Sequence, residues 1–224
     1  MGLFSTKGSE SDNELATNFY FPTSKNALII FTRNPELGKV KTRLAKSVGD
    51  KTALDIYHFL LHKTKEATKN ISCDKTVYYS KKIIKDDLWN RSNYHKKEQF
   101  GNDLGEKMKN AIDDGFKKKY KKIILIGSDL FDLKPSHIND AFKKLDHNDV
   151  VIGPAKDGGY YLIGLKKLHL KIFENKNWGS STVREDTLKN LEKVDVHLLS
   201  MLNDVDVIED IENHSAFTKF LKPR

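Results

Sequence analysis

The amino-acid sequence predicts an α/β protein in which a mostly parallel sheet is covered by helices on both faces. Short apolar runs with the length of buried strands alternate with segments of helical periodicity along most of the chain. This alternation favours parallel strands that are joined through helices. The length of 224 residues and a hydrophobic content of 38% suit one large domain with a substantial core.

The individual elements follow from these patterns. The expected strands are residues 27–32, 76–79, 122–126, 150–153, 160–165 and 194–199. A helix is expected to begin near Thr42, and others to cover residues 51–69, 104–118, 136–145, 182–191 and 207–221. Segment 81–98 shows no period that favours either type. Residues 1–25, rich in Ser, Thr, Asn and Glu, predict a flexible tail before a single domain over 26–224.

The net charge of +8 fits a well-solvated lysine-rich surface or an anionic ligand. The lysine clusters are short and scattered and lack interleaved aromatic residues, which argues against a nucleic-acid partner. No apolar run approaches the roughly 20 residues that cross a bilayer, so no membrane span is expected. The single cysteine, Cys73, indicates a reducing compartment, and we expect a cytoplasmic protein.

Ligands of parallel α/β sheets bind beyond the carboxyl ends of the strands. The loops that follow the predicted strands there are residues 33–43, 127–132, 154–159 and 203–206. We therefore expect the chemistry of this protein to lie in these loops.

The first loop, TRNPELGKVKTRLA, is basic and precedes a helix. It carries Arg33, Lys39, Lys41 and Arg43 around Gly38. Cations beside the free N–H groups of a helix start form a phosphate site, although the pattern is not a Walker A loop. The alternative interpretation is an ordinary solvated loop.

The second loop, GSDLFDL, carries two carboxylates. Asp129 directly follows the strand, where a carboxylate can hold Mg²⁺ or Mn²⁺. Asp129 could instead cap a turn, and Asp132 is expected to cap the helix that begins near Pro135.

The third loop, GPAKDGG, joins two predicted strands. Asp-Gly is a favoured hairpin turn, which is the simplest interpretation of Asp157 and Gly158. Asp157 would nevertheless project on the ligand side, and Gly158 with Gly159 permits close backbone approach to a ligand.

The fourth loop, LNDVDVIEDI, contains Asp204 and Asp206. Asp206 with Glu209 fits a helix cap, whereas Asp204 could supply a second metal ligand opposite Asp129. Cationic and acidic loops thus recur on one predicted edge, as a metal–nucleotide site requires.

These motifs together resemble a bacterial family of transferases with the GT-A fold, of the radical-SAM/selenodomain-associated or arsenosugar-biosynthesis type. The resemblance covers about residues 26–215, and KTRLA and DGGYYLIGL are its most specific motifs. The family is similar to nucleotidyltransferases such as phospholactate guanylyltransferase and molybdenum-cofactor guanylyltransferase.

The resemblance implies a Rossmann-like GT-A fold, a divalent metal and a nucleotide-diphosphate donor. It assigns nucleotide binding to the basic residues of the first loop and to Gln99 and Gly101. It assigns the metal to Asp129 with Asp204 or Asp206. It places Asp157, Gly158 and Gly159 on the donor-sugar or acceptor side, and Trp178 at the acceptor pocket.

This chain departs from the family pattern at two places. Phe131 stands where the family usually has Pro, which affects the rigidity of the loop. Trp178-Gly179-Ser180 replaces Trp-Ser-Thr, which bears on the identity of the acceptor. The metal-binding Asp and the KTR motif are intact.

The leading hypothesis is a metal-dependent glycosyltransferase that passes a sugar from a nucleotide sugar to a small-molecule acceptor, with Asp157 as catalytic base beside Asp129. The alternative is a nucleotidyltransferase that joins a nucleoside triphosphate to a phosphorylated metabolite and releases pyrophosphate. The first loop has only Gly38 where such enzymes usually have a Gly-rich loop, which argues against the alternative. The oligomeric state is left open.

Overall fold

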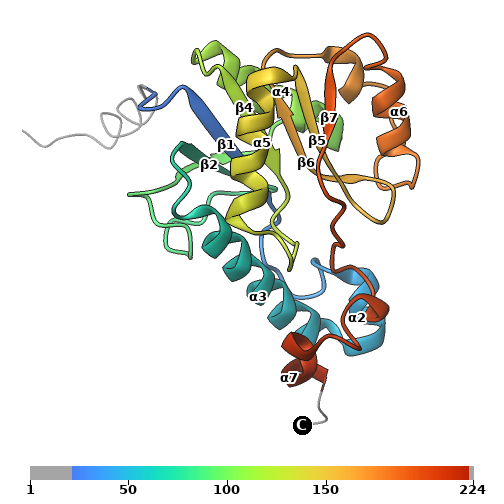
Figure 1. Ribbon diagram of the computed structural model, residues 1–224. Coiled ribbons are helices and arrows are strands. Elements are labelled where there is room, and N and C mark those ends of the chain that lie inside the picture. The colour runs from blue at the N-terminus through green and yellow to red at the C-terminus, as the bar shows by residue number, and fades with distance from the viewer. Residues whose placement is uncertain (1–21, 222–224) are drawn as a thin grey trace, which may run out of the picture.

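The computed structural model describes residues 22–221 (Figure 1). Residues 1–21 of the expected tail lie outside this range. At its near end, the backbone N–H groups of Thr23 and Ser24 donate to the carboxylate of Asp74, at 2.9 and 3.2 Å. Thr23 and Ser24, which were expected in the tail, thus contact the domain.

Strands and helices alternate as the sequence predicts. The strands are β1 (Asn26–Thr32), β2 (Asp74–Tyr79), β3 (His95–Glu98), β4 (Lys122–Ile126), β5 (Val150–Pro154), β6 (Tyr160–Leu165) and β7 (Val196–Leu198). The α-helices are α2 (Thr42–Val48), α3 (Asp50–Thr68), α4 (Leu104–Lys117), α5 (Pro135–His147), α6 (Val183–Lys189) and α7 (Thr218–Leu221). Short 3₁₀ helices are η1 (Leu170–Phe173), η2 (Ile208–Asp210) and η3 (Ser215–Phe217).

The strands form one seven-stranded sheet in the order β3-β2-β1-β4-β6-β5-β7. Strands β3, β2, β1 and β4 pair in parallel, and β5 pairs in parallel with β7. Only β6 runs against its neighbours β4 and β5. The predicted mostly parallel α/β sheet is therefore confirmed, and its carboxyl edge faces downward in Figure 1.

Helices cover both faces of the sheet. On one face, α3 and α5 pack Tyr57, Leu61 and Ile138 against Leu28 and Ile124 of the central strands. On the other face, the buried side chains come from α4, η1 and the end of α6. The alternation along β1 decides this division, since Leu28 and Ile30 point to one cluster and Ala27, Ile29 and Phe31 to the other.

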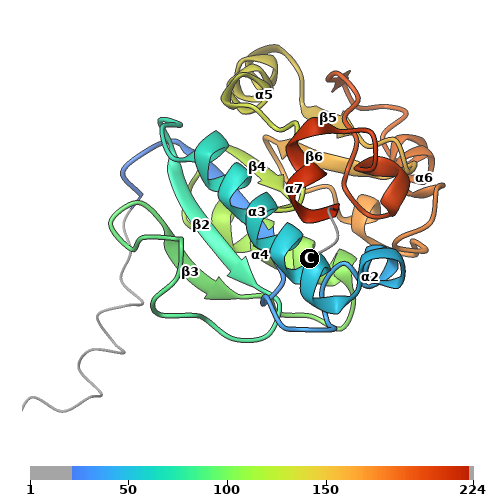
Figure 2. The same ribbon diagram turned by 90° about the horizontal axis from the view of Figure 1, so that it is seen from below.

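A third apolar cluster lies below the carboxyl edge, where α2, α3 and the last segments of the chain meet (Figures 1 and 2). Leu44, Ile56 and Phe217 are each fully buried in it. The C-terminal segment is thereby anchored against the loop that follows β1. No helix within residues 22–221 is long and apolar enough to cross a membrane.

One unassigned segment and one expected element need correction. Segment 81–98, for which the sequence favoured neither type, contains an edge strand, β3, whose residues HKKE are exposed or half-buried and so carry no apolar signal. The expected helix over 207–221 is broken into η2, η3 and α7. Its apolar residues pack in the third cluster as separate turns, because Ile211 and Phe217 are buried there from different turns.

Candidate functional site

Two cavities open at the carboxyl edge of the sheet, beneath the ends of β1 and β4 and the hairpin that joins β5 to β6. They share Leu104, Gly127 and Asp129 as a common wall. Asp129 follows β4, which lies at the centre of the sheet between β1 and β6. The second of the predicted loops, residues 127–132, therefore separates the two cavities.

The larger space, which we call the cationic cavity, has a volume of about 490 Å³. Its charged lining residues are Arg33, Lys39, Lys81, Lys107 and Asp129, so positive charge dominates. The remaining lining residues are Phe31, Thr32, Asn34, Tyr57, Ser80, Gln99, Leu104, Gly127 and Ser128. A cavity of this size and charge suits the phosphates and part of the nucleoside of a nucleotide.

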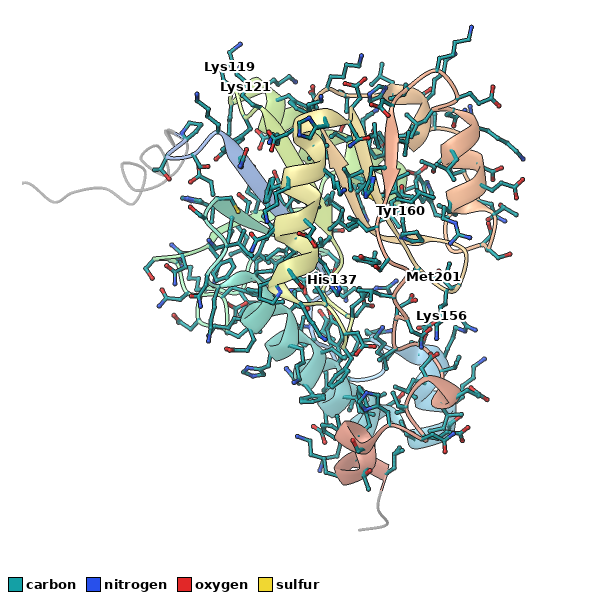
Figure 3. The ribbon with its side chains drawn as sticks, viewed as in Figure 1. Lys119, Lys121, His137, Lys156, Tyr160 and Met201 are labelled. Atoms are coloured by element: carbon teal, nitrogen blue, oxygen red, sulfur yellow. The ribbon has the colours of Figure 1, made fainter. Side chains whose placement is uncertain are left out.

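The smaller space, which we call the acidic cavity, has a volume of about 190 Å³. Asp129, Asp157 and Asp204 bring carboxylates to it. Its other lining residues are Leu104, Met108, Gly127, Leu130, Ala155, Gly159, Tyr160, Tyr161, Trp178, Gly179, Ser180 and Val183. Figure 3 places Tyr160 near the lower edge of the sheet, with Lys156 of the same hairpin beyond it toward α2.

Lys41 forms an ion pair with Asp129. Its Nζ lies 2.6 Å from Asp129 Oδ2, and its side chain is only 5% exposed. Burial alone would lower the pKa of Lys41, but the charge and hydrogen bond of Asp129 outweigh it and raise that pKa. For Asp129, burial is opposed by the Lys41 ammonium and by Arg33, so its pKa lies below the usual value.

The backbone of Lys41 is in the left-handed region, with φ 48° and ψ 43°, where it caps α2. A side chain other than Gly, Asn or Asp rarely adopts this conformation, which costs about 1–3 kcal/mol. The ion pair with Asp129 and the burial of the side chain hold Lys41 in this strained conformation. The loop conformation and the position of Asp129 are therefore coupled.

Asp204 approaches the same carboxylates from the other side of the acidic cavity. Burial, followed by the charges of Asp157 and Asp129, raises the pKa of Asp204 to about 6. Asp129, Asp157 and Asp204 all line this cavity, so three carboxylates meet there. Asp157 itself is positioned by its turn, since its Oδ1 accepts a 2.8 Å hydrogen bond from the N–H of Gly159.

Tyr57 joins the first two loops through its hydroxyl. The Oη accepts from the backbone N–H of Arg33 at 2.9 Å and lies 3.2 Å from Thr32 Oγ1 and 3.4 Å from Ser128 Oγ. Its ring belongs to the apolar core on which α3 packs, and burial raises the pKa of the hydroxyl. The sequence showed Tyr57 only as part of an apolar stripe, so its polar role was missed.

Asn34 and Gln99 tie further loops to the cationic cavity. Asn34 Nδ2 donates to the carbonyl of Lys82 at 2.8 Å, and its Oδ1 accepts from the N–H of Lys81 at 3.0 Å. Gln99 Nε2 donates to the carbonyls of Thr32 and Tyr78, at 3.2 and 3.0 Å. These contacts fix the residue that the sequence associated with the base, Gln99, in the cavity wall.

Not every predicted residue lies at the cavities. Arg43 Nη1 pairs with Asp206 Oδ2 at 2.6 Å, and neither residue lines either cavity. Of the two acids proposed as a second metal ligand, the structure therefore brings Asp204, not Asp206, to Asp129. The lysines near β4's start, Lys119 and Lys121, lie at the opposite end of the sheet (Figure 3).

The predicted glycines serve the backbone. Gly101 has φ 139°, and a Cβ there would lie 2.9 Å from the N–H nitrogen of Lys107, so the loop after β3 packs tightly on α4. Gly158 has φ 92°, and a Cβ would lie 2.0 Å from the carbonyl oxygen of Ser181. Gly159 alone of this pair lines the acidic cavity.

Both expected caps were wrong. Helix α5 has Lys134 as its cap residue, so Asp132, which is exposed, is not the cap. At η2, Asp210 rather than Glu209 supplies the capping carboxylate, since its Oδ2 accepts from the N–H groups of Asp206 and Val207 at 2.8 and 2.9 Å. The Asp206 side chain is thereby left to Arg43.

The donor set determines whether a divalent metal fits. Within residues 22–221, no group of three or more His, Cys, Asp or Glu side chains is arranged to hold a metal by itself. Mg²⁺ is usually bound by one or two carboxylates together with substrate phosphates and water. Asp129, which lines both cavities, and Asp204, which lines the acidic cavity, fit that arrangement.

The fold is that of nucleotide-diphospho-sugar transferases. The chain belongs to the family described as "Uncharacterized protein conserved in bacteria" (DUF2064), whose profile matches residues 63–180. No curated protein matches the chain.

Among solved structures, the chain is similar to a provisionally named nucleotide-diphospho-sugar transferase from Desulfovibrio desulfuricans G20. The two share 31% identity over 88% of this chain and 91% of that one, with a TM-score of 0.78. It also superposes on 4-diphosphocytidyl-2C-methyl-D-erythritol synthase from Anaerococcus prevotii, with 12% identity, coverage of 87% and 96% and a TM-score of 0.58. A cytidylyltransferase from Leptospira borgpetersenii gives 16% identity, 88% coverage of both chains and a TM-score of 0.52. The last two similarities concern the fold alone.

Proposed function

We propose that this protein is a metal-dependent glycosyltransferase with a nucleotide-diphosphate sugar as donor. The observation that carries the proposal is the meeting of a cationic and an acidic cavity at Asp129. Phosphate-binding cations on one side and carboxylates on the other suit the transfer of a group away from a diphosphate. The similarity to the Desulfovibrio protein, whose name specifies such a donor, supports the same class.

In this proposal the donor lies in the cationic cavity. Arg33, Lys39, Lys81 and Lys107 bind the diphosphate, and Gln99 contacts the base. Tyr57 fixes the backbone of Arg33, so the loop presents its cation without a large ordering cost. Lys41 acts indirectly, by orienting Asp129.

Asp129 and Asp204 would hold a divalent ion, Mg²⁺ or Mn²⁺, against the diphosphate. When bound, this ion supplies charge stabilisation to the departing nucleoside diphosphate. The acceptor enters the acidic cavity, where Asp157 takes the proton from its nucleophilic hydroxyl. Trp178 and Ser180 line the acceptor side. The narrower kinship with arsenosugar-type transferases belongs to this proposal and rests on the KTRLA and DGGYYLIGL motifs.

The second candidate is nucleotidyl transfer. The superpositions on two cytidylyl-transferring proteins, with TM-scores of 0.58 and 0.52, favour it at the level of the fold. The cationic cavity would then hold a nucleoside triphosphate, and the group transferred would be a nucleoside monophosphate.

A thermal-shift panel with Mn²⁺ tests the proposal. Nucleotide sugars, nucleoside diphosphates and nucleoside triphosphates are compared on wild type, Asp129→Ala and Asp132→Ala. A ligand that binds only the folded state raises the Tm with its occupancy. The matched control is Asp132, an exposed carboxylate three residues away that lines neither cavity.

We expect one nucleotide sugar to stabilise wild type and Asp132→Ala but not Asp129→Ala. Stabilisation by triphosphates alone would transfer the support to nucleotidyl transfer. If none of these ligands stabilises the wild type, the nucleotide site itself is refuted.

A further inference from the structure

The two cavities differ in charge, and the difference restricts the second substrate. None of the described residues that line the acidic cavity is Lys, Arg or His. The cationic cavity, in contrast, has Arg33, Lys39, Lys81 and Lys107 in its wall. An anionic group in the acidic cavity would face Asp157 and Asp204 without a cation of its own.

Two cations beside the acidic cavity contact residues of its wall. Lys41 Nζ is 2.6 Å from Asp129 and is almost completely buried. Arg184 Nη1 donates to the carbonyl of Ala155 at 3.1 Å. A divalent ion on Asp129 and Asp204 would, together with Lys41, only balance the charge of the three carboxylates, so these groups leave no net positive charge for an acceptor.

We propose that the acceptor is a small hydroxyl compound without phosphate or carboxylate groups, bound through an apolar face. This inference rests on the proposed function, because it assigns the acidic cavity to the acceptor. A buried anion that lacks a counter-charge loses its hydration without compensation. The cavity therefore discriminates against phosphorylated compounds, which are the acceptors that the nucleotidyl-transfer alternative requires.

The apolar part of this recognition is built in advance. Trp178 packs against the first turn of α4, where a Cβ at Gly105 would lie 2.6 Å from its ring. Leu104, Met108 and Val183 complete an apolar wall beside it. At about 190 Å³ the cavity is smaller than the roughly 300–1,000 Å³ of sites for drug-sized ligands. It therefore fits a compound, or a terminal group, of a few ring atoms.

A transfer assay with matched acceptors tests the inference. The wild type, Mn²⁺ and the donor found by thermal shift are incubated with glycerol or glycerol 3-phosphate, and with fructose or fructose 6-phosphate. Products are quantified by mass spectrometry. We expect the neutral member of each pair to be used at least about tenfold better, corresponding to about 1.4 kcal/mol. Preference for the phosphorylated members would overturn the inference.

A lysine introduced into the cavity should reverse this selectivity. Ser180 lines the acidic cavity, whereas its neighbour Ser181 is exposed and does not. Ser180→Lys is expected to raise relative use of the phosphorylated acceptors, and Ser181→Lys, which adds the same charge, is expected to leave it unchanged. Equal effects of the two variants would contradict a role of the cavity's own charge.

Tryptophan quenching tests the charge without any donor. Of the two tryptophans, Trp89 is 1% exposed and Trp178 lines the acidic cavity. The measured quantity is the ratio of the quenching constant of Trp178 for iodide, an anion, to that for acrylamide, which is neutral. We expect this ratio to be at least about twofold lower in wild type than in the double variant Asp157→Asn/Asp204→Asn, because the carboxylates repel iodide. If nucleotides fail to bind but this ratio holds, the proposed function fails while the cavity's charge stands. If nucleotides bind but iodide quenches both proteins equally, the inference fails alone.

Discussion

Two ion pairs connect the loop after β1 to distant carboxylates, and they differ in burial rather than in length. Lys41–Asp129 and Arg43–Asp206 both have N–O distances of 2.6 Å. The Lys41 side chain is 5% exposed, whereas that of Arg43 is 66% exposed. The basic loop therefore has two halves: residues up to Lys41 serve the cavities, and Arg43 ties the loop to the C-terminal segment.

Burial determines what each pair contributes. The two carboxylates are similarly exposed, 41% for Asp129 and 38% for Asp206, so the pairs differ in the burial of the cation. Water and salt screen a pair less when one of its charges is buried. The same distance thus implies a large energetic role for Lys41 and a small one for Arg43. Three experiments test this difference between the two ion pairs.

The largest effect is expected for Lys41→Met. Removing the ammonium leaves Asp129 uncompensated, and because that side chain is 41% exposed, we expect a loss of about 1–3 kcal/mol in the free energy of unfolding. Urea denaturation measures it. Lys46→Met, at an exposed position of the same helix, is the control. A loss under about 0.5 kcal/mol would mean that the pair is as weak as a surface ion pair.

The contribution of the buried pair should depend on pH. The pKa of Asp129 is lowered from 3.8, so its stabilising effect is present above that value and is lost as the pH falls through the folded-state pKa. The pKa of Lys41 is raised, so its effect persists below 10.5 and is lost at still higher pH.

The difference in unfolding free energy between wild type and Lys41→Met is therefore expected to be largest near neutral pH and to shrink in acid. Denaturation series in metal-free buffer across the acid range measure this difference. A difference that stays constant below the Asp129 pKa would show that packing of the Lys41 stem, rather than its charge, is what the mutation removes.

The smallest effect is expected for Arg43→Met. An exposed pair contributes about 0–1 kcal/mol, and 1 M salt screens it over about 3 Å. We expect a loss below about 0.5 kcal/mol that vanishes in 1 M NaCl, by the same denaturation assay. A larger, salt-resistant loss would place Arg43 in the same energetic class as Lys41.

The sequence predicted the sheet and the edge at which both cavities open, because apolar strand runs and strand-end loops are local features. It grouped Arg43 and Lys41 together, since contacts of Lys41 across 88 residues and of Arg43 across 163 have no local signal. It could not choose between Asp204 and Asp206 for the same reason. The choice depends on which side chain the end of β7 turns toward the sheet.

Two further residues show the limits of periodicity. Tyr57 has the spacing of a core residue and is one, yet its hydroxyl organises the loop at Arg33. Strand β3 was missed because an edge strand with residues HKKE buries too little to produce alternation. In both cases the contact that matters is made with another element: Tyr57 with the loop at Arg33, and β3 with β2. A pattern along one segment does not reveal such a contact.

The reversed direction of β6 has a consequence for redesign. Because β5 and β6 are antiparallel, a short turn at residues 155–159 reaches the acidic cavity without a crossover helix. That turn packs on residues 180–184 through the close approach of Gly158 to Ser181 and the 3.0 Å hydrogen bond from Arg184 N to Gly158 O. The two loops therefore form one exchangeable unit. If the proposed glycosyl transfer holds, grafts meant to alter acceptor specificity should carry both loops and can leave the residues of the cationic cavity as they are.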